Sequence, residues 1–130
     1  MLLAVAVGGA AGALLRWALG DAFPDGAGFP WTTFGINLVG SFLLAALPAL
    51  IAAGQRPLLT LALGPGALGG FTTLSAYAEQ SRALIADGAA LSAGAYLLGT
   101  LAACLVAVQL GSRLATSAAR RDVADQEGNE

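Results

Sequence analysis

Three long stretches of this sequence carry no charged side chain, and this spacing constrains the fold more than any other feature. No Asp, Glu, Lys or Arg lies between Asp25 and Arg56, between Arg56 and Glu79, or between Asp87 and Arg113. An α-helix needs about 20 predominantly apolar residues to cross a bilayer. Each stretch is therefore long enough to form one membrane-spanning helix.

The N-terminal segment, residues 2–19, is a fourth candidate span, and Arg16 near its end is its only charged residue. A cleaved signal peptide is the competing interpretation, but such a peptide carries positive charge ahead of its apolar core. Here the apolar core begins at Leu2 and the arginine follows it. We therefore expect the segment to remain in the protein as a helix.

The composition agrees with a membrane protein and limits its chemistry. Of the 130 residues, 57% are hydrophobic and 11% are charged, whereas soluble domains carry roughly 25% charged residues. The sequence contains no Lys and no His, which removes the commonest general base and the commonest metal ligand. The net charge of −2 is too small to indicate a nucleic acid partner. We expect the lipid bilayer as the surroundings and no enzymatic activity.

The predicted fold is an all-α integral membrane protein with four transmembrane helices. Turn-forming residues separate helices expected over residues 2–20, 31–53, 58–86 and 89–114. In this interpretation residues 1–115 form the transmembrane domain, and the polar residues 116–130 form a disordered tail. Four arginines lie on the side of the termini and two on the other side. This bias favours both termini in the cytoplasm. We expect a multi-pass protein of the cell inner (plasma) membrane.

The first helix carries small residues at four-residue spacing, with Gly8 and Gly12 on the same face as Arg16. Small residues at this spacing allow two helices to approach closely in lipid, so we expect a packing role for the glycines. An arginine within a span is costly unless it snorkels to the interface or faces protein or water. The sequence leaves both arrangements open for Arg16.

Polar side chains recur at four-residue intervals in the second and fourth helices: Thr33, Asn37 and Ser41, then Ser92, Tyr96, Thr100 and Cys104. One explanation is hydrogen bonding between helices, which is worth about 1 kcal/mol or less for each bond. The other is a row of donors along a permeation path. Two such ladders in so apolar a chain favour the path. Cys104 is the only cysteine and cannot form an internal disulfide.

The third helix contains four glycines and a proline in residues 64–70, ahead of a hydroxyl cluster. Proline removes a backbone donor and glycine weakens a helix, so the hydrogen-bond ladder should break in this region. Broken backbone at membrane depth is tolerated where it is buried in protein or lines a cavity. We expect Thr72 or Thr73 to cap the restarted helix. A helix that is only kinked for packing is the alternative.

Three motifs in register resemble the CrcB/Fluc family of fluoride channels: GGAAGALLR at 8–16, TTFGINLVGSF at 32–42 and GGFTTLSAY at 69–77. The resemblance covers nearly everything before the tail. It implies a four-helix subunit that pairs antiparallel into a dual-topology dimer with two fluoride pathways. It also implies a central structural sodium ion, held by the backbone carbonyls of Gly69 and Thr72.

The family's pathway residues fall on this chain by motif, and the physical argument adds Ser41 as a further donor. The expected fluoride pathway is Asn37, Ser41, Leu74, Tyr77, Tyr96, Thr100 and Cys104. The family has phenylalanines where this chain has Leu74 and Tyr77, so both positions depart from its pattern. Leucine offers no ring edge to an anion, whereas tyrosine keeps the ring.

The function implied is a fluoride-selective channel that allows passive efflux of fluoride from the cytoplasm and so reduces its toxicity. We expect either a homodimer or, because of Leu74, a heterodimer with a paralogous subunit. A proton-coupled exporter of the small multidrug-resistance type is the alternative, but it requires a carboxylate within the first helix, and residues 2–20 contain none. Glu79 is interpreted as a helix-end charge. A purely structural membrane protein would leave the ladders and the broken helix unexplained.

Overall fold

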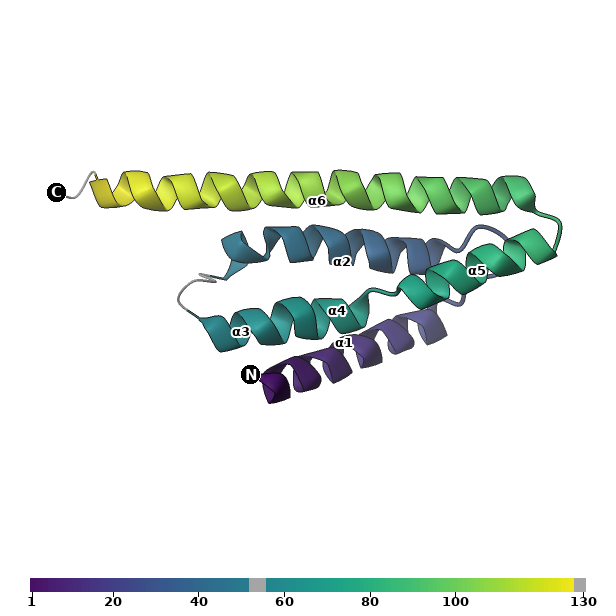
Figure 1. Cartoon of the computed structure of the whole chain (residues 1–130), viewed down its shortest axis with the longest axis horizontal. Helices are drawn as coiled ribbons and strands as arrows, with labels where there is room; N and C mark the ends of the chain where they lie inside the picture. The colour runs from purple at the N-terminus through teal and green to yellow at the C-terminus, as the bar shows by residue number, and fades with distance from the viewer. Residues whose placement is uncertain (52–55, 128–130) are drawn as a thin grey trace.

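A computed structural model describes residues 1–51 and 56–127, with side chains through residue 117, and the described backbone consists of helices and turns. Within these residues, four segments are long and apolar enough to cross a membrane: Leu2–Ala22, Trp31–Leu50, Pro57–Ala86 and Ala90–Ser117. This confirms the predicted all-α fold with four transmembrane helices. Figure 1 shows the helices lying side by side, with successive spans running in opposite directions.

Three of the spans are single helices: α1 (Leu2–Ala22), α2 (Trp31–Leu50) and α6 (Ala90–Glu127). The third span is divided into α3 (Pro57–Leu61), a π-helical segment η2 (Ala62–Leu68), α4 (Gly69–Phe71) and α5 (Leu74–Ala86). The α1–α2 and α5–α6 connections lie at one end of the bundle, and the N-terminus lies toward the other end (Figure 1).

Two expected helix ends differ from the structure. The second helix was expected to reach residue 53 but ends at Leu50, because Pro48 weakens its last turn and Ile51 is extended, with φ −136° and ψ 115°. Residues 52–55 lie outside the described residues. The backbone of α6 continues to Glu127 rather than ending near residue 114. Ala, Arg, Gln and Glu are strong helix formers, which explains the extension into the expected tail. The domain boundary at residue 115 stays a prediction.

The third span accommodates Pro65 and breaks further along the chain. Pro65 lies inside η2, where wider π turns absorb the lost hydrogen bond; such insertions occur frequently at functional sites. The break itself falls at Thr72, whose backbone is extended with φ −73° and ψ 158°. Thr73 then caps α5, because its hydroxyl accepts a hydrogen bond from the Ala76 amide at 3.1 Å. The predicted break and cap are therefore both present.

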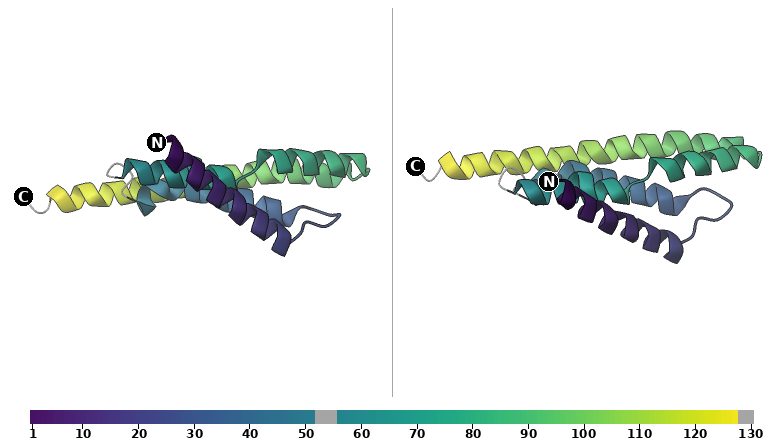
Figure 2. Two further views of the ribbon diagram at one scale, coloured as in Figure 1. Left: turned by 90° about the horizontal axis from the view of Figure 1, so that it is seen from below. Right: turned by 60° about the horizontal axis from the view of Figure 1, so that its bottom comes forward.

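Glycines bring the backbone of α1 against the third span. A Cβ atom added at Gly8 would collide with the Ala62 carbonyl, and one added at Gly12 would collide with the Ala67 carbonyl. A Cβ atom added at Gly70 in the third span would likewise collide with the Gly9 carbonyl of α1. The packing role expected for Gly8 and Gly12 is thus visible as direct backbone contact. Figure 2 shows α1 crossing the other helices at an angle.

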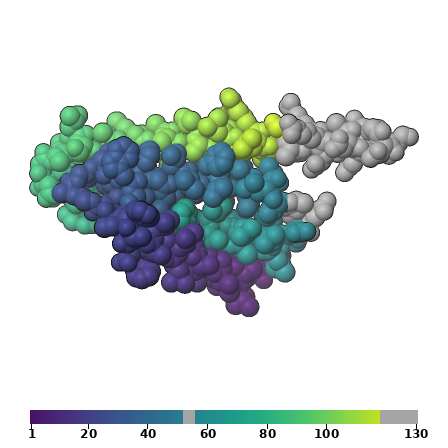
Figure 3. All heavy atoms as spheres, turned by 180° about the vertical axis from the view of Figure 1, so that it is seen from behind, coloured from purple at the N-terminus to yellow at the C-terminus, as the bar shows by residue number. Residues whose placement is uncertain are grey.

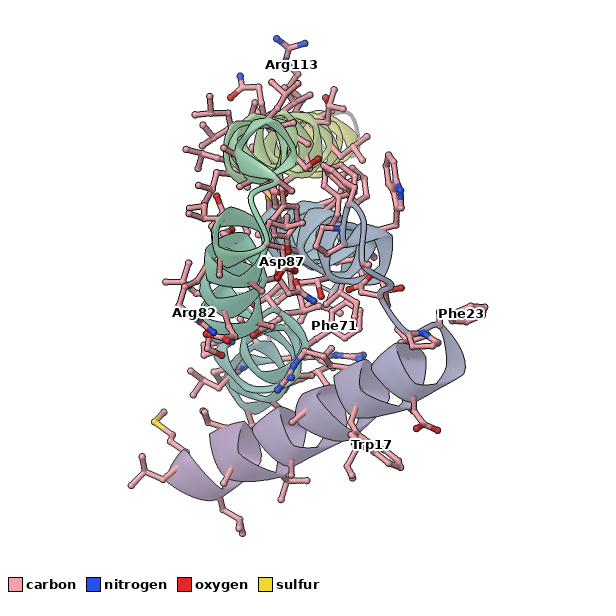
Figure 4. The ribbon with its side chains drawn as sticks, turned by 90° about the vertical axis from the view of Figure 1, so that its right-hand side faces the viewer. Trp17, Phe23, Phe71, Arg82, Asp87 and Arg113 are labelled. Carbon is pink, nitrogen blue, oxygen red and sulfur yellow. The ribbon has the colours of Figure 1, made fainter. Side chains whose placement is uncertain are left out.

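The helices cover one another only in part. From the face drawn in Figure 3, α2 lies between α6 and α1. Trp17 and Phe23 point away from the bundle at α1, and Arg113 points away from it at α6 (Figure 4). Phe71 points into the bundle and is 7% exposed. Large apolar side chains remain exposed along all four spans, as expected for helices that face lipid.

We expect Gly12→Ala to lower the free energy of unfolding by roughly 1–3 kcal/mol, the usual cost of overpacking. The added methyl group meets backbone rather than a movable side chain. Gly9→Ala is the matched control in the same stripe, since its Cβ would lie 3.9 Å from the Gly66 carbonyl oxygen. Thermal unfolding in detergent measures both, and equal midpoints for the two variants would contradict the packing role.

Candidate functional site

A cavity of about 240 Å³ lies between α2, the start of α5 and α6. It is lined by Asn37, Ser41, Thr72, Thr73, Leu74, Tyr77, Thr100, Leu101 and Cys104. Every residue expected on the fluoride pathway lines it except Tyr96. The two polar ladders therefore meet here, because Asn37 and Ser41 are one turn apart on α2 and Thr100 and Cys104 are one turn apart on α6.

Asn37 holds the break in the third span. Its Nδ2 donates to the Thr73 carbonyl at 3.1 Å, and its Oδ1 accepts from the Thr73 amide at 2.8 Å. In a continuous helix the Thr73 amide would instead donate to the Gly69 carbonyl, four residues earlier. The side chain of Asn37 thus replaces a helical hydrogen bond and fixes the start of α5.

Thr100 lines the cavity and is 3% exposed, and its hydroxyl group has no partner. Among the described residues, its Oγ1 is the one buried side-chain oxygen that forms no hydrogen bond. A buried hydroxyl without a partner costs about 1–3 kcal/mol. The site therefore contains a donor that a ligand would satisfy.

The two tyrosines direct their hydroxyl groups away from the cavity. The Tyr77 hydroxyl donates to the Leu97 carbonyl at 2.7 Å, while its ring stays on the cavity wall. Tyr96 is completely buried, and its hydroxyl donates to Gln80 Oε1 at 2.8 Å. Tyr96 was expected on the pathway, but the structure places it behind the wall, with its ring centroid 5.2 Å from that of Tyr77.

The break also releases the backbone oxygens that were expected to hold sodium. The Gly69 carbonyl loses its helical donor because the Thr73 amide donates to Asn37. Thr72 is extended, so its carbonyl lies outside the helical ladder, while its hydroxyl donates to the Leu68 carbonyl at 3.1 Å. Carbonyl oxygens are suitable ligands for a hard cation. Gly69 and Thr72 therefore fit the expected role.

Arg16 is half-buried and faces protein at the break. Its Nε donates to the Gly70 carbonyl at 3.2 Å. The guanidinium group borders a second cavity of about 480 Å³ at the loop end of the bundle, together with Asp21 and Asp25. Of the two arrangements that the sequence left open, the structure shows the one that faces protein and a cavity.

A hydrogen-bond network at the loop end of the bundle was not predicted from the sequence. Asp25 Oδ1 accepts from the Thr32 amide at 2.7 Å, and Asp25 Oδ2 accepts from the Thr33 hydroxyl at 2.9 Å and from Gln80 Nε2 at 3.0 Å. Asp25 thereby caps α2, whose first residues lack a side-chain cap of their own. One sequence signal could have pointed to Gln80: its spacing of seven residues from Thr73 and three from Tyr77 puts these three side chains on the same helical face.

Asp25 lies in the α1–α2 loop, outside the spans. Its partial burial would by itself raise the pKa of the carboxyl group, but hydrogen bonds from Thr32, Thr33 and Gln80 outweigh that effect. The pKa is therefore lowered from its ordinary value. At neutral pH Asp25 is a carboxylate that only accepts hydrogen bonds.

Comparison with known proteins decides the family. The sequence model described as CrcB-like protein, Camphor Resistance (CrcB), matches residues 3–112. The chain belongs to the CrcB family. It is 43% identical over 127 residues to the fluoride-specific ion channel FluC 2 of Nocardia farcinica (strain IFM 10152), which covers 93% of this chain and 91% of that protein.

Other relatives in the CrcB family carry similar names. The chain is 46% identical over 112 residues to the fluoride-specific ion channel FluC 1 of Streptomyces coelicolor, with 83% of this chain and 72% of that protein covered. It is 41% identical to the fluoride-specific ion channel FluC of Novosphingobium aromaticivorans, with 82% and 89% covered. The CrcB family is therefore one of ion channels rather than enzymes, and this member is a multi-pass membrane protein.

We expect Asn37→Ala to free the start of α5, because the Thr73 amide and carbonyl both lose their partner. Amide exchange at Thr73 should accelerate by about tenfold or more, as expected for the loss of buried hydrogen bonds worth roughly 1–3 kcal/mol. Hydrogen exchange in detergent micelles measures this rate. Ser41→Ala, on the same cavity wall, is the control and should leave it unchanged. Equal protection in all three chains would show that Asn37 does not hold the break.

Proposed function

We propose that this chain is a subunit of a fluoride-selective channel that allows passive efflux of fluoride from the cytoplasm and thereby reduces fluoride toxicity. The observation that best supports this proposal is the cavity where the two ladders meet. Thr100, whose hydroxyl has no hydrogen-bond partner, is one of the residues that line it. The names of the relatives supply the identity of the ion. The inner (plasma) membrane is the compartment in which such efflux protects the cell.

The cavity offers the donors that a small anion needs when it leaves water. Fluoride accepts hydrogen bonds strongly, so a pathway has to replace those lost from its hydration shell. Thr100 has a free hydroxyl donor, and Asn37 has a second amide hydrogen besides the one that binds Thr73. Ser41 and the weaker thiol donor of Cys104 line the same wall. These groups form a short row along α2 and α6.

The aromatic contribution comes from Tyr77 alone. Its hydroxyl is bound to Leu97, which fixes the ring on the cavity wall. An aromatic ring attracts an anion with its positive edge. Leu74 lines the same cavity but is 78% exposed and has no ring. The proposed pathway is thus weakened at this position within one subunit.

A proton-coupled exporter fits this structure less well. Such a mechanism needs a carboxylate inside the membrane that exchanges a proton for a cation. The candidate within the third span is Glu79, which is exposed and forms an ion pair with Arg82 at 2.6 Å. Glu79 also lies outside the residues that line the cavity. A neutral, donor-rich cavity favours passive movement of an anion.

Sodium is proposed as a structural ion at the break. The carbonyls of Gly69 and Thr72 would hold it, together with the same groups of a second subunit. A bound sodium ion would supply positive charge that stabilises the freed carbonyls. The residues of this chain would do the rest: Asn37 diverts the Thr73 amide from Gly69, and the Thr72 backbone turns out of the helix.

A second subunit is proposed to complete the pathway. The rim residues Leu74 and Leu101 are 78% and 56% exposed, so the cavity of one chain is open on that side. An antiparallel partner would cover this apolar rim and bring two helix breaks together at a two-fold axis. A partner that carries phenylalanine at the position of Leu74 would restore one complete pathway. The numbered names of two relatives, FluC 1 and FluC 2, agree with such paralogous pairs.

We expect Thr100→Val to reduce fluoride efflux from liposomes by about tenfold or more. The substitution keeps the side-chain shape and removes one donor from the pathway, a loss comparable to one buried hydrogen bond to an ion of about 1.5–3 kcal/mol. Thr116→Val is the control on the same helix, because its hydroxyl is bound to the Ser112 carbonyl outside the cavity. Unchanged efflux in Thr100→Val would remove Thr100 from the pathway.

Fluoride efflux should be greater when the chain is expressed with a paralogous subunit than when it is expressed alone. The reason is that both pathways of a homodimer would contain Leu74. Leu74→Phe is the matched variant and should raise efflux of the chain alone by about threefold or more, if one aromatic contact contributes about 0.5–1.5 kcal/mol. If the unsubstituted chain alone releases fluoride as fast as the chain with a paralogous subunit, and Leu74→Phe gives no gain, the need for a different partner would be contradicted.

A further inference from the structure

The network at the loop end joins the α1–α2 loop, α2, α5 and α6. From Asp25 the hydrogen bonds continue through Gln80, whose Nε2 donates to Asp25 and also to the Thr33 hydroxyl at 2.9 Å. Gln80 Oε1 then accepts from the Tyr96 hydroxyl. Tyr96 is fully buried and has no access to water, so its hydroxyl depends on Gln80 for a partner.

The carboxylate of Asp25 determines the direction of every hydrogen bond in this network. Because it only accepts, Gln80 must present its amide nitrogen to Asp25 and its amide oxygen to Tyr96. The Tyr96 hydroxyl must then donate to Gln80. Reversal of the Gln80 amide would place its oxygen against the carboxylate and its NH2 group against the tyrosine. One loop residue thus fixes a chain of donors that reaches α6.

This network is one of three polar attachments that hold α5; another is the hydrogen bond from the Tyr77 hydroxyl to the Leu97 carbonyl of α6. Asn37 fixes the start of α5 through Thr73, and Gln80 fixes it about two turns further along. Within α5 only Ser81 and Leu84 are buried, and Leu84 packs with Ala93 and Tyr96 of α6. The buried apolar packing of α5 is therefore limited to this one cluster. α5 also carries Leu74 and Tyr77, which form one wall of the cavity.

We propose that Asp25 is a positioning residue for ion passage: through Gln80 and Tyr96 it holds α5 against α2 and α6 and so sets the geometry of the cavity. The proposal rests on the proposed function. Asp25 does not line the cavity itself, so it acts through the position of the wall and not by touching the ion. The lowered pKa keeps it ionised across the neutral range.

A simple effect of charge is the competing explanation and requires a control. Asp25 shares the cavity at the loop end with Arg16 and Asp21 from α1, and a smaller cavity with Asp87 at the end of α5. Asp21→Asn removes the same charge from the same cavity without disturbing the network. If charge alone acted, Asp21→Asn and Asp25→Asn would change fluoride efflux in the same direction.

A double substitution tests the direction of the network. Asp25→Asn leaves two amides facing each other, and Gln80→Glu leaves two carboxylates facing each other. The two substitutions together restore alternating donors and acceptors between positions 25, 80 and 96: the new amide donates to the new carboxylate, which still accepts from the Tyr96 hydroxyl. The Thr33 amide, which donates to Asp25 Oδ2 at 3.2 Å, loses this acceptor in both chains that carry Asp25→Asn. The net charge of the double variant equals that of the unsubstituted chain. Fluoride efflux from liposomes and thermal unfolding midpoints are measured for all four chains and for Asp21→Asn.

Each single substitution should lower efflux at about pH 7.5 by about tenfold or more, and the double variant should return to within about threefold of the unsubstituted chain. Two adjacent carboxylates cannot both ionise, so one pKa of the pair in Gln80→Glu is raised. Efflux of that variant should therefore recover as the pH falls toward about 5.5, and that of the double variant should show no such recovery. Asp21→Asn should not lose efflux.

Each outcome has a defined consequence. A double variant no better than the worse single variant in both measurements would overturn the proposal. If the unfolding midpoints fall in the single variants and recover in the double variant while fluoride efflux stays constant in all of them, the positioning role would be overturned. An equal loss of fluoride efflux in Asp21→Asn would also overturn it. If the unsubstituted chain, alone and with a paralogous subunit, releases no fluoride, the proposed function fails. The midpoints of the four chains would then decide whether the network holds α5.

Discussion

The pairing of the Asn37 amide with the Thr73 backbone is the interaction on which the rest of this structure depends. Backbone groups left unpaired in a bilayer cost several kcal/mol each, so a helix cannot simply stop there. Asn37 supplies one donor and one acceptor from a neighbouring helix. Without it, the Thr73 amide and carbonyl would both lose their partner, and the start of α5 would no longer be fixed.

The break is held on two sides and left open on a third. From α1, the glycine contacts bring backbone against backbone, and Arg16 binds the Gly70 carbonyl. From α2, Asn37 binds Thr73. The remaining side is the cavity rim, where Leu74 is exposed. A fixed backbone beside an open cavity is the reason for proposing a second subunit.

Features that depend on spacing along the chain were predictable from the sequence. The three uncharged stretches and the apolar N-terminal segment located the four spans, and the spacing of Gly8 and Gly12 located the packing face of α1. The periodicity of a sequence shows which face of a helix a residue occupies. It does not show how deeply the side chain is buried or which group it hydrogen-bonds. For this reason Tyr96 was placed with Thr100, although its hydroxyl binds Gln80. Asp25 lies 55 residues from Gln80, and no local pattern connects them.

The proposed function requires that this chain forms a pathway selective for fluoride. The most direct test is the release of fluoride and of chloride from liposomes that contain the purified chain, alone and with a paralogous subunit. A fluoride-selective pathway should release fluoride well above the level of protein-free liposomes, with chloride retained. Equal release of both ions, or no fluoride release from either preparation, would contradict it.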